Sequence, residues 1–380
     1  MDFQLNDEQR AIRAVARELA DGEIRPVAGE LDREGRFPYE IVAKLGELGF
    51  MGMPFDQEYG GGGTDYISYA LVIEELARVD SSVAITVAAH TSLGTYPIHA
   101  FGSEEQRREW LPQLCSGKRL GAFGLTEPEA GSDASAIRTT ARQDGAGGDW
   151  VINGSKQFIT NAGTDVSGCV TISALTGEGE ISAFLVPRDA PGYRVAAPYR
   201  KMGWKASDTR PLSFDDCRLP AGSLLGRRGR GYAHLLETLA GGRISVSAMG
   251  VGLAQGALDE ALAYARQRHA FGQQISKFQA IQMKLADIAT EIEAARLLTL
   301  RAAALKDRRH PKFDIVAAAA KLKTGRLAVR AAEEAVQIHC GYGYIEDYPV
   351  CRFYRDAKVL TIGEGTDEVQ QMVIARYLGC

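Results

Sequence analysis

A single glutamate near the C-terminus has the setting of a catalytic base. Glu364 lies between Gly363 and Gly365, and an apolar helical stripe that includes Val369 and Met372 follows it. Glycines on both sides let the backbone approach a ligand closely. A carboxylate held in such a turn away from water would have a raised pKa and could remove a proton near neutral pH. A solvated glutamate just before a helix has the same pattern, so this segment alone leaves both roles open.

A loop rich in hydroxyl, proline and glycine residues could contact a polar ring or a phosphate. Residues 125–133 read LTEPEAGSD, so that Thr126 and Ser132 flank a turn. Such a turn can present backbone N–H groups and hydroxyls to a ligand. A loop at a domain junction with capping hydroxyls has the same composition, and for this segment alone it is the simpler interpretation.

Two aromatic residues have neighbours suited to a flat cofactor. Phe158 and Thr160 lie two residues apart and would share one face of a strand, which suits a ring such as isoalloxazine. Arg268 and Phe271, three apart after a helical stretch, could hold a phosphate and stack on an adenine. Ordinary sheet packing and a surface arginine are the simpler interpretations of each pair taken alone.

The glycines of residues 250–256 (GVGLAQG) raise the alternative of an NADP-binding turn. Ile244, Val246 and Ala248 could form the strand before it. However, the surrounding sequence has helical periodicity, and no second strand ending in Asp, Glu or Arg lies about 20 residues further on, as a dinucleotide-binding fold requires. Small residues for close helix packing are the better interpretation.

Composition narrows the class of protein. The 380 residues include 44 Lys and Arg against 48 Asp and Glu, a formal charge of −4, which argues against nucleic acid as the main partner. The six cysteines form no CxxC pair and have no zinc-like spacing with histidines, so reduced thiols and no metal site are predicted. The N-terminus lacks a leader pattern and no apolar stretch approaches spanning length. We therefore expect a cytoplasmic protein.

Helical patterns occupy the first third of the chain. Asn6 with Gln9 resembles a capping pair, and a helical stripe follows. A longer helix is predicted at about residues 66–79. The uncharged stretch 81–101 is apolar on most faces, so we expect it to be buried.

Strand patterns begin near residue 120 and continue to about residue 225. The pair Asn153-Gly154 between two apolar runs predicts a hairpin. Strands are predicted at residues 150–152, 158–160, 181–186 and 212–214. Helical periodicity returns near Gly231 and continues to the end, so helices, a compact β region and helices again predict an α+β multidomain protein.

Taken together and in order, these segments resemble the acyl-CoA dehydrogenase family over essentially the whole chain. The most specific matches are residues 126–133 (TEPEAGSD), 268–273 (RHAFGQ), 341–344 (GYGY) with 355–358 (RDAK), and 364–366 (EGT). Each motif is moderately specific alone, whereas the ordered set is a strong resemblance.

The resemblance implies a three-part fold and FAD as cofactor. A helical N-terminal domain would occupy residues 1–120, a middle β-barrel-like domain 121–227 and a C-terminal four-helix bundle 228–380. The flavin would be lined by Phe123, Leu125, Thr126, Ser132, Phe158 and Thr160. The adenosine and pyrophosphate would be held, partly across a subunit interface, by Arg268, Phe271, Gln279, Gln337 and Gly341. The cofactor site would be completed by Thr366 and Glu368.

The resemblance also implies a reaction, the α,β-dehydrogenation of a saturated acyl thioester to the trans-2-enoyl thioester. Glu364 would remove the α-proton while the β-hydrogen leaves as hydride to flavin N5. The thioester oxygen would accept a hydrogen bond from the base's own backbone N–H, which stabilises the enolate-like transition state. Ser132, Arg243 and Gly365 would contact the substrate.

Partners are implied in the same way. An electron-transfer flavoprotein would reoxidise the flavin. A homotetramer, or at least a dimer, is implied because a neighbouring subunit usually helps to hold FAD in this family.

Three positions distinguish this chain from some or many of the relatives. Some relatives carry the base just before the arginine that matches Arg243, and Gly242 stands there in this chain, which favours Glu364. Ala240 replaces an aspartate that contacts the pantetheine arm in many relatives, and Gly363 replaces a frequent aromatic. The last two changes leave open an acyl group on acyl carrier protein instead of coenzyme A.

Alternative activities remain at this point. An acyl-CoA oxidase or another flavoenzyme on the same scaffold would differ in how fast its reduced flavin reacts with oxygen. A non-catalytic helical interaction protein or an NADP-binding reductase would lack bound flavin.

Overall fold

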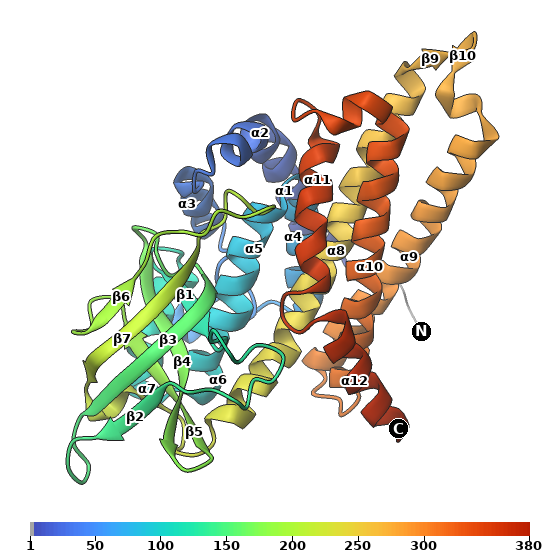
Figure 1. Cartoon of the computed structure of the whole chain (residues 1–380). Helices are drawn as coiled ribbons and strands as arrows, with labels where there is room; N and C mark the ends of the chain where they lie inside the picture. The colour runs from blue at the N-terminus through green and yellow to red at the C-terminus, as the bar shows by residue number, and fades with distance from the viewer. Residues whose placement is uncertain (1–3) are drawn as a thin grey trace.

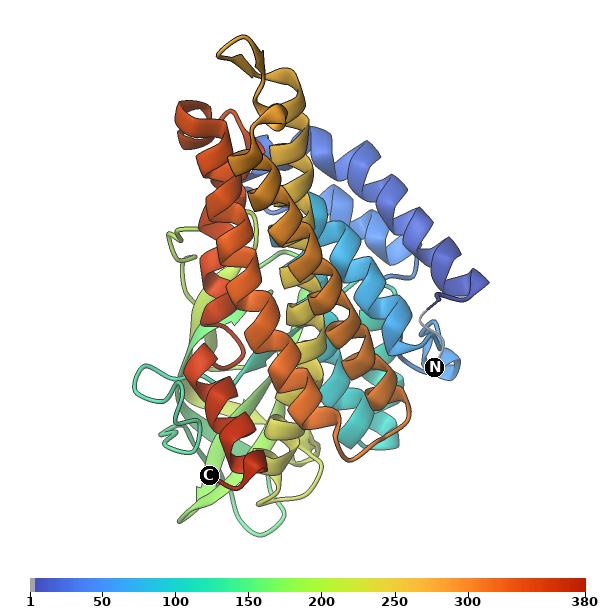
Figure 2. The same ribbon diagram turned by 90° about the vertical axis from the view of Figure 1, so that its right-hand side faces the viewer.

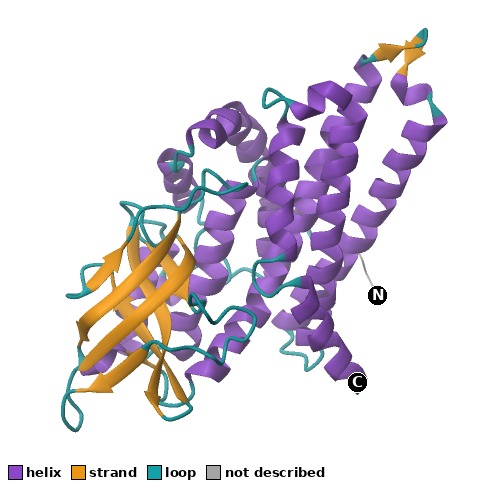
Figure 3. Cartoon of the chain, viewed as in Figure 1, coloured by secondary structure: helices purple, strands orange, loops and turns teal. Residues whose placement is uncertain are grey.

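The chain runs through helices, then strands, then helices again (Figure 1, Figure 3). The computed structural model describes residues 4–380, and Met1–Phe3, the start of the segment without a leader pattern, lie outside the described residues. Within that part of the chain, none of the helices combines the length and the apolar character needed to cross a bilayer. The order of elements confirms the predicted α+β class.

The N-terminal helices follow the predicted signals. Asn6 and Gln9 form a reciprocal capping box at the start of α1, and the predicted 66–79 helix is α4, which begins after the N-cap Asp65. The stretch 81–101 is helical and largely buried, as expected. The helices are α1 (Asp7–Leu19), α2 (Arg25–Glu34), α3 (Tyr39–Glu47), α4 (Tyr66–Val79), α5 (Ser81–Ala88), α6 (Tyr96–Phe101) and α7 (Glu104–Cys115), with π-helical turns η1 (Ala20–Ile24) and η3 (Ala89–Thr95).

The strands form one sheet in two halves. Its order is β6-β7-β3-β2-β4-β5-β8, with β1 parallel to β4, and the halves are joined where Thr140 of β2 faces Leu175 of β4. Trp150 and Phe184, one from each half, meet edge to face at 5.0 Å, so the two halves pack on a shared core. The strands are β1 (Leu120–Gly124), β2 (Thr140–Gln143), β3 (Trp150–Thr160), β4 (Ser167–Gly177), β5 (Glu180–Pro187), β6 (Tyr193–Val195), β7 (Thr209–Leu219) and β8 (Leu224–Leu225).

The hairpin predicted at Asn153-Gly154 is wrong. Both residues lie inside β3, which pairs with β7 along its length and has a register shift at Gly154. Gly154 has φ +147°, and a Cβ there would lie 2.5 Å from Thr139 Oγ1. Asn153 exchanges two hydrogen bonds with Asp216 of β7. The dipeptide therefore serves a β-bulge with a close approach of a neighbouring segment, and does not reverse the chain.

The C-terminal part is a bundle of long helices (Figure 2). A short hairpin of β9 (His269–Ala270) and β10 (Gln273–Gln274) joins α8 to α9 at one end of the bundle. The helices are α8 (Gly231–Gln267), α9 (Gln279–Asp307), α10 (Phe313–His339), α11 (Pro349–Ala357) and α12 (Asp367–Leu378), with 3-10 turns η6 (Cys340–Tyr344) and η7 (Lys358–Thr361).

The two helical regions share one hydrophobic core, which includes buried residues of α4, α5, α8 and α10, while the sheet has its own. A buried aspartate joins the parts. Asp356 of α11 accepts hydrogen bonds from Ser81 Oγ of α5 at 2.8 Å and from the backbone N–H of Trp204, in the loop before β7, at 2.7 Å. Burial raises the pKa of Asp356 to about 7. This contact fixes the sheet against the helices at the level of α11.

The glycines of residues 250–256 lie in the middle of α8, which excludes the NADP-binding turn. A Cβ on Gly252 would lie 2.1 Å from the carbonyl oxygen of Glu74 on α4, and one on Gly256 would lie 2.1 Å from that of Arg78. A Cβ on Gly250 would lie 2.8 Å from Thr324 Cβ on α10. Glycine thus lets α8 contact α4 and α10 closely, as the packing interpretation predicts.

We predict that Gly252→Ala lowers the free energy of unfolding by about 2 kcal/mol, because the added methyl group would push α8 away from α4. Thermal or urea unfolding measures the loss. Gly22→Ala is the matched control, since a Cβ at Gly22 meets nothing within 4 Å. Equal stability of the two variants would contradict this account of the glycine contacts.

Candidate active site

Glu364 lies in a strained turn between η7 and α12, as the sequence predicts. Its φ is +52°, in the left-handed region that glutamate seldom adopts, and Gly365 follows with φ +90°. Thr366 caps α12 by accepting a hydrogen bond from Val369 N–H at 3.3 Å. Strain of this kind costs about 1 kcal/mol or more and persists only where the surroundings hold it.

Two side chains donate hydrogen bonds to the backbone carbonyls of the turn. Lys321 Nζ of α10 donates to the Gly365 carbonyl at 2.7 Å. Gln370 Nε2 of α12 donates to the same carbonyl at 3.1 Å and to that of Glu364 at 3.2 Å. The backbone of the turn is therefore fixed while the Glu364 side chain remains unbound.

The Glu364 carboxylate is buried and has no hydrogen-bond partner. Both oxygens are shielded from solvent, and neither is hydrogen-bonded by any group in residues 4–380. The carboxylate packs against α8 at Gly242, where an added Cβ would lie 2.2 Å from Glu364 Oε2 and 3.1 Å from Leu93 of η3. Glycine at position 242 thus provides the space that the glutamate occupies.

This environment moves the ionisation of Glu364 towards neutral pH. Burial raises the pKa of its carboxyl from 4.5 to about 7, because the charged form loses water without gaining a hydrogen bond. The positive charges of Lys321 and Arg243 oppose the rise without cancelling it. A carboxylate with these properties can act as a base near pH 7.

Arg243 is also a buried group with spare hydrogen-bonding capacity. It lies well inside α8 and not at the start of the helix. Only 8% of it is exposed, and its Nε lacks a partner among the described residues. Burial lowers its pKa, while the charges of Asp314 and Glu364 oppose this. Its guanidinium remains available to a ligand beside Glu364.

The sheet brings together part of the predicted flavin-lining set. The backbone N–H of Gln157 donates to the Thr126 carbonyl at 2.8 Å, which places the 123–126 segment beside β3. Phe158 follows with φ +61° in a bulge, and 62% of it is exposed. The bulge breaks the simple two-residue alternation assumed for Phe158 and Thr160, and presents an aromatic face to solvent.

A buried ion pair supports this region. Lys156 Nζ, fully buried, contacts Glu127 Oε1 at 2.7 Å and donates to the Leu125 carbonyl at 3.3 Å. Glu127 also accepts hydrogen bonds from the N–H groups of Arg138 and Thr139. The pair fixes the loop after β1 to the strand that carries Phe158.

The predicted adenosine-binding residues lie elsewhere. Arg268 and Phe271 are at the α8–α9 connection, at the end of the bundle far from the sheet (Figure 1). Phe271 is 94% exposed, and the Arg268 guanidinium lies 5.8 Å from the ring centre of Tyr342. The other predicted adenosine-binding residues, Gln279, Gln337 and Gly341, are exposed at the same end of the bundle. Of the remaining predicted cofactor residues, Ser132 is exposed in its loop, Thr160 is half-buried, and Glu368 is exposed in the first turn of α12. Within one chain, the predicted flavin-lining residues and the predicted adenosine-binding residues therefore do not lie together.

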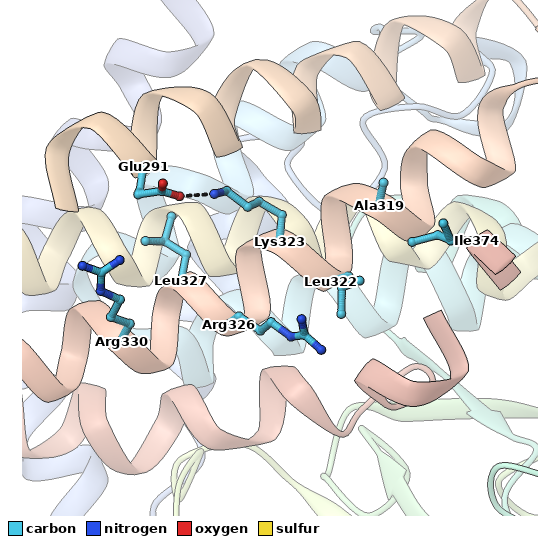
Figure 4. A pocket seen from close by; sticks show the side chains of 8 residues that line it. All are labelled: Glu291, Ala319, Leu322, Lys323, Arg326, Leu327, Arg330 and Ile374. Carbon is cyan, nitrogen blue, oxygen red and sulfur yellow. Dashed lines mark hydrogen bonds and ion pairs between the residues drawn. The ribbon is translucent and has the colours of Figure 1, made fainter. Parts of the chain in front are cut away.

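A groove on the outer side of the bundle is not part of this site. It has a volume of about 360 Å³ and lies among α9, α10 and α12 (Figure 4). Its wall includes apolar Leu322 and Leu327, and the ion pair of Glu291 with Lys323 crosses it. None of the predicted site residues lines it.

Three consecutive family descriptions match the chain. Residues 6–118 match the N-terminal domain of acyl-CoA dehydrogenase, 122–217 the middle domain and 229–379 the C-terminal domain. The chain is 49% identical to the probable acyl-CoA dehydrogenase YngJ of Bacillus subtilis, over 100% of both chains. The chain belongs to the acyl-CoA dehydrogenase family.

Solved structures agree with this membership. Butyryl-CoA dehydrogenase from Megasphaera elsdenii is 43% identical with a TM-score of 0.97, and the match covers 100% of both chains. The prolyl acyl carrier protein oxidase AnaB is 30% identical with a TM-score of 0.94, covering 99% of this chain and 100% of that one. Both structures span the helical regions and the sheet.

Acyl-CoA dehydrogenases are FAD-dependent, so the predicted cofactor is the one that the family uses. The residues present fit a flavin. The exposed Phe158 ring offers an apolar face, and half-buried Phe123 and Thr126 lie on the neighbouring segment. The buried, unpartnered carboxylate of Glu364 lies on the helical side.

Sequence reasoning missed several groups that shape this site. Lys321 and Gln370, which hold the Glu364 turn, were not predicted. Lys156 was not predicted either, and its partner Glu127 lies in the 125–133 loop without a predicted role. One signal was available for Lys321, since a lysine ends the apolar run of residues 315–320 at a position on the buried side of the helix.

We predict that Glu364 makes stability depend on pH. The pKa of its carboxyl is higher in the folded protein than in the unfolded chain. Its contribution to the free energy of unfolding is therefore fully present below pH 4.5 and is lost as the pH rises to about 7. The amide of Glu364→Gln does not titrate. Between pH 4.5 and about 7, the free energy of unfolding of this variant should therefore rise by on the order of 3 kcal/mol relative to that of the unmodified protein. Unfolding of both proteins across this range measures the difference, and other groups cancel because they are common to both. A constant difference would refute the raised pKa.

Proposed function

We propose that the chain catalyses FAD-dependent α,β-dehydrogenation of a saturated acyl thioester, with Glu364 as the base that removes the α-proton. The observation that carries this proposal is the buried carboxylate without a hydrogen-bond partner, packed against Gly242. A structural glutamate would be paired or solvated, because an unpaired buried carboxylate destabilises the fold. Its pKa of about 7 suits a base at neutral pH.

Each protein group has a distinct task in this proposal. Glu364 holds the abstracted proton on its carboxylate. Its own backbone N–H takes part in no hydrogen bond within the described chain, so it can donate to the thioester oxygen as negative charge develops there. Gly365 keeps the turn open to the substrate, and Arg243 and Ser132 contact the thioester or its carrier. FAD, when bound, supplies the hydride acceptor.

The cofactor would be held by residues from two copies of the chain. The flavin-lining residues of the sheet and the adenosine-binding residues near Phe271 lie at opposite ends of one chain. The strong exposure of Phe271 supports contact with FAD bound mainly by a second copy. This arrangement supports a homotetramer or dimer, and an electron-transfer flavoprotein would accept the electrons.

The relatives support a proposal for the substrate class. Butyryl-CoA dehydrogenase, with its TM-score of 0.97, supports a short acyl-CoA. The similarity to a prolyl acyl carrier protein oxidase keeps a protein-bound acyl group and an oxidase reaction as the second candidate. Ala240, which replaces the aspartate common at the pantetheine arm, favours neither carrier by itself.

We predict that Glu364→Gln abolishes turnover, by about 10⁴-fold or more, while FAD stays bound. The amide cannot take up the α-proton, although it fills the same space. Stopped-flow bleaching of the flavin by an acyl-CoA measures the loss, and the absorbance of the purified protein reports FAD. Glu18→Gln, an exposed glutamate on α1, is the control and should react normally. Near-normal bleaching by Glu364→Gln would remove Glu364 from the mechanism.

We also predict that butyryl-CoA bleaches the flavin faster than octanoyl-CoA or palmitoyl-CoA in an anaerobic titration. The same acyl group on acyl carrier protein should react more slowly. Reaction with the protein-bound acyl group alone would establish the second carrier, and rapid reoxidation of the reduced flavin by oxygen would establish an oxidase.

A further inference from the structure

A buried lysine with no carboxylate within hydrogen-bond distance among the described residues contacts the Glu364 turn. Lys321 of α10 is 0% exposed. Its nearest carboxylate oxygen, Asp367 Oδ1, is 4.0 Å away, and the other oxygen of Asp367 accepts from Arg326 Nε at 3.0 Å. The hydrogen bond that Lys321 makes goes to a neutral group, the Gly365 carbonyl, at 2.7 Å. Buried lysines are normally paired with an acid, so this position calls for a reason.

Support of the turn alone does not explain a positive charge. Gln370 donates to the same Gly365 carbonyl from α12 and carries no charge. A second neutral donor in place of Lys321 would hold the turn without the desolvation that a buried ammonium suffers. That desolvation is evident in the pKa of Lys321, which burial lowers to about 8. The charge therefore acts on the nearby carboxylates, Asp367 first and Glu364 second, and not through the hydrogen bond.

The charged and titratable groups around the turn come from four helices. On α10, Lys321 and Arg326 face it, and Arg243 faces it from α8. On α12, Asp367 is bound to Arg326 and Glu368 is exposed. The remaining groups within electrostatic reach are Tyr69 of α4, which faces Glu364, and Asp314 of α10, which faces Arg243.

Of the two buried carboxylates in this cluster, Asp367 is hydrogen-bonded to Arg326 and Glu364 has no hydrogen-bonded cation. We propose, on the assumption that Glu364 is the base, that Lys321 is a positioning residue with two separable roles. Its hydrogen bond holds the turn, and its charge keeps Glu364 ionised at a lower pH than burial alone would allow. Gln370 shares the first role and lacks the second.

The sign of the effect follows from electrostatics. A nearby ammonium favours the carboxylate over the protonated acid, so removal of the ammonium raises the pKa of Glu364. With its own pKa near 8, Lys321 is mainly charged where Glu364 titrates. Loss of the charge should move the acidic limb of the activity profile to higher pH, by roughly one unit. Loss of the Gln370 hydrogen bond should leave that limb in place.

The experiment compares Lys321→Met with Gln370→Leu in the FAD-loaded protein. The rate of flavin bleaching by butyryl-CoA is measured across pH. We expect Lys321→Met to be several-fold slower near pH 7 and to approach the unmodified rate at alkaline pH. Gln370→Leu should lose activity by a similar factor at every pH. Lys321→Arg, which keeps the charge, should restore the original limb.

A second readout does not depend on turnover. The pH range over which Glu364→Gln gains stability reports the ionisation of Glu364 directly. When the same substitution is made in Lys321→Met, this range should move to higher pH. When it is made in Gln370→Leu, the range should stay in place. The proposal would be overturned if Lys321→Met shifted neither the pH range of the stability gain nor the acidic limb of the activity profile. Equal shifts in Lys321→Met and Gln370→Leu would also overturn it. Full turnover by Glu364→Gln would instead overturn the base assignment, and the stability readout would still decide whether Lys321 controls Glu364.

Discussion

The structure depends on one constraint, which is the burial of an ionisable carboxylate that no group in residues 4–380 hydrogen-bonds. An unpaired buried acid destabilises a fold, and it is tolerated where a ligand or a reaction uses it. Here Gly242 leaves space for the carboxylate, and Gly365, with φ +90°, allows the tight turn. Lys321 and Gln370 fix the backbone of that turn from two helices. The surroundings therefore determine the position of Glu364 while its oxygens remain free.

The fold puts the Glu364 turn on the helical bundle and the predicted flavin-lining residues on the sheet and the loop beside it. The glycines of α8 allow it to approach α4 and α10, so Gly242 and Arg243 lie in a rigid core. The sheet has a separate core, and the pair of Lys156 with Glu127 fixes the loop after β1 to β3. Asp356 fixes the sheet to the helices. A reaction that needs a base and a flat cofactor on opposite sides of a substrate fits this division.

Local patterns in the sequence predicted much of this architecture. The Asn6 capping box, helix α4 and the Glu364 turn were predictable because their signals lie within a few residues of one another. Contacts between distant segments were not predictable. The acceptor of Lys321 lies 44 residues away in sequence and the partner of Lys156 lies 29 away. The Asn-Gly signal at residue 153 was misleading, because a bulge against Thr139 uses the same residues as a hairpin turn.

The pKa of the Glu364 carboxyl tests the central claim most directly. Infrared difference spectra between the unmodified protein and Glu364→Gln, recorded across pH, isolate the carbonyl band of the protonated carboxyl. The account predicts that this band disappears with a midpoint near 7. Loss of the band near the ordinary value of 4.5 would show that the carboxylate is solvated or paired in solution, and would contradict the account.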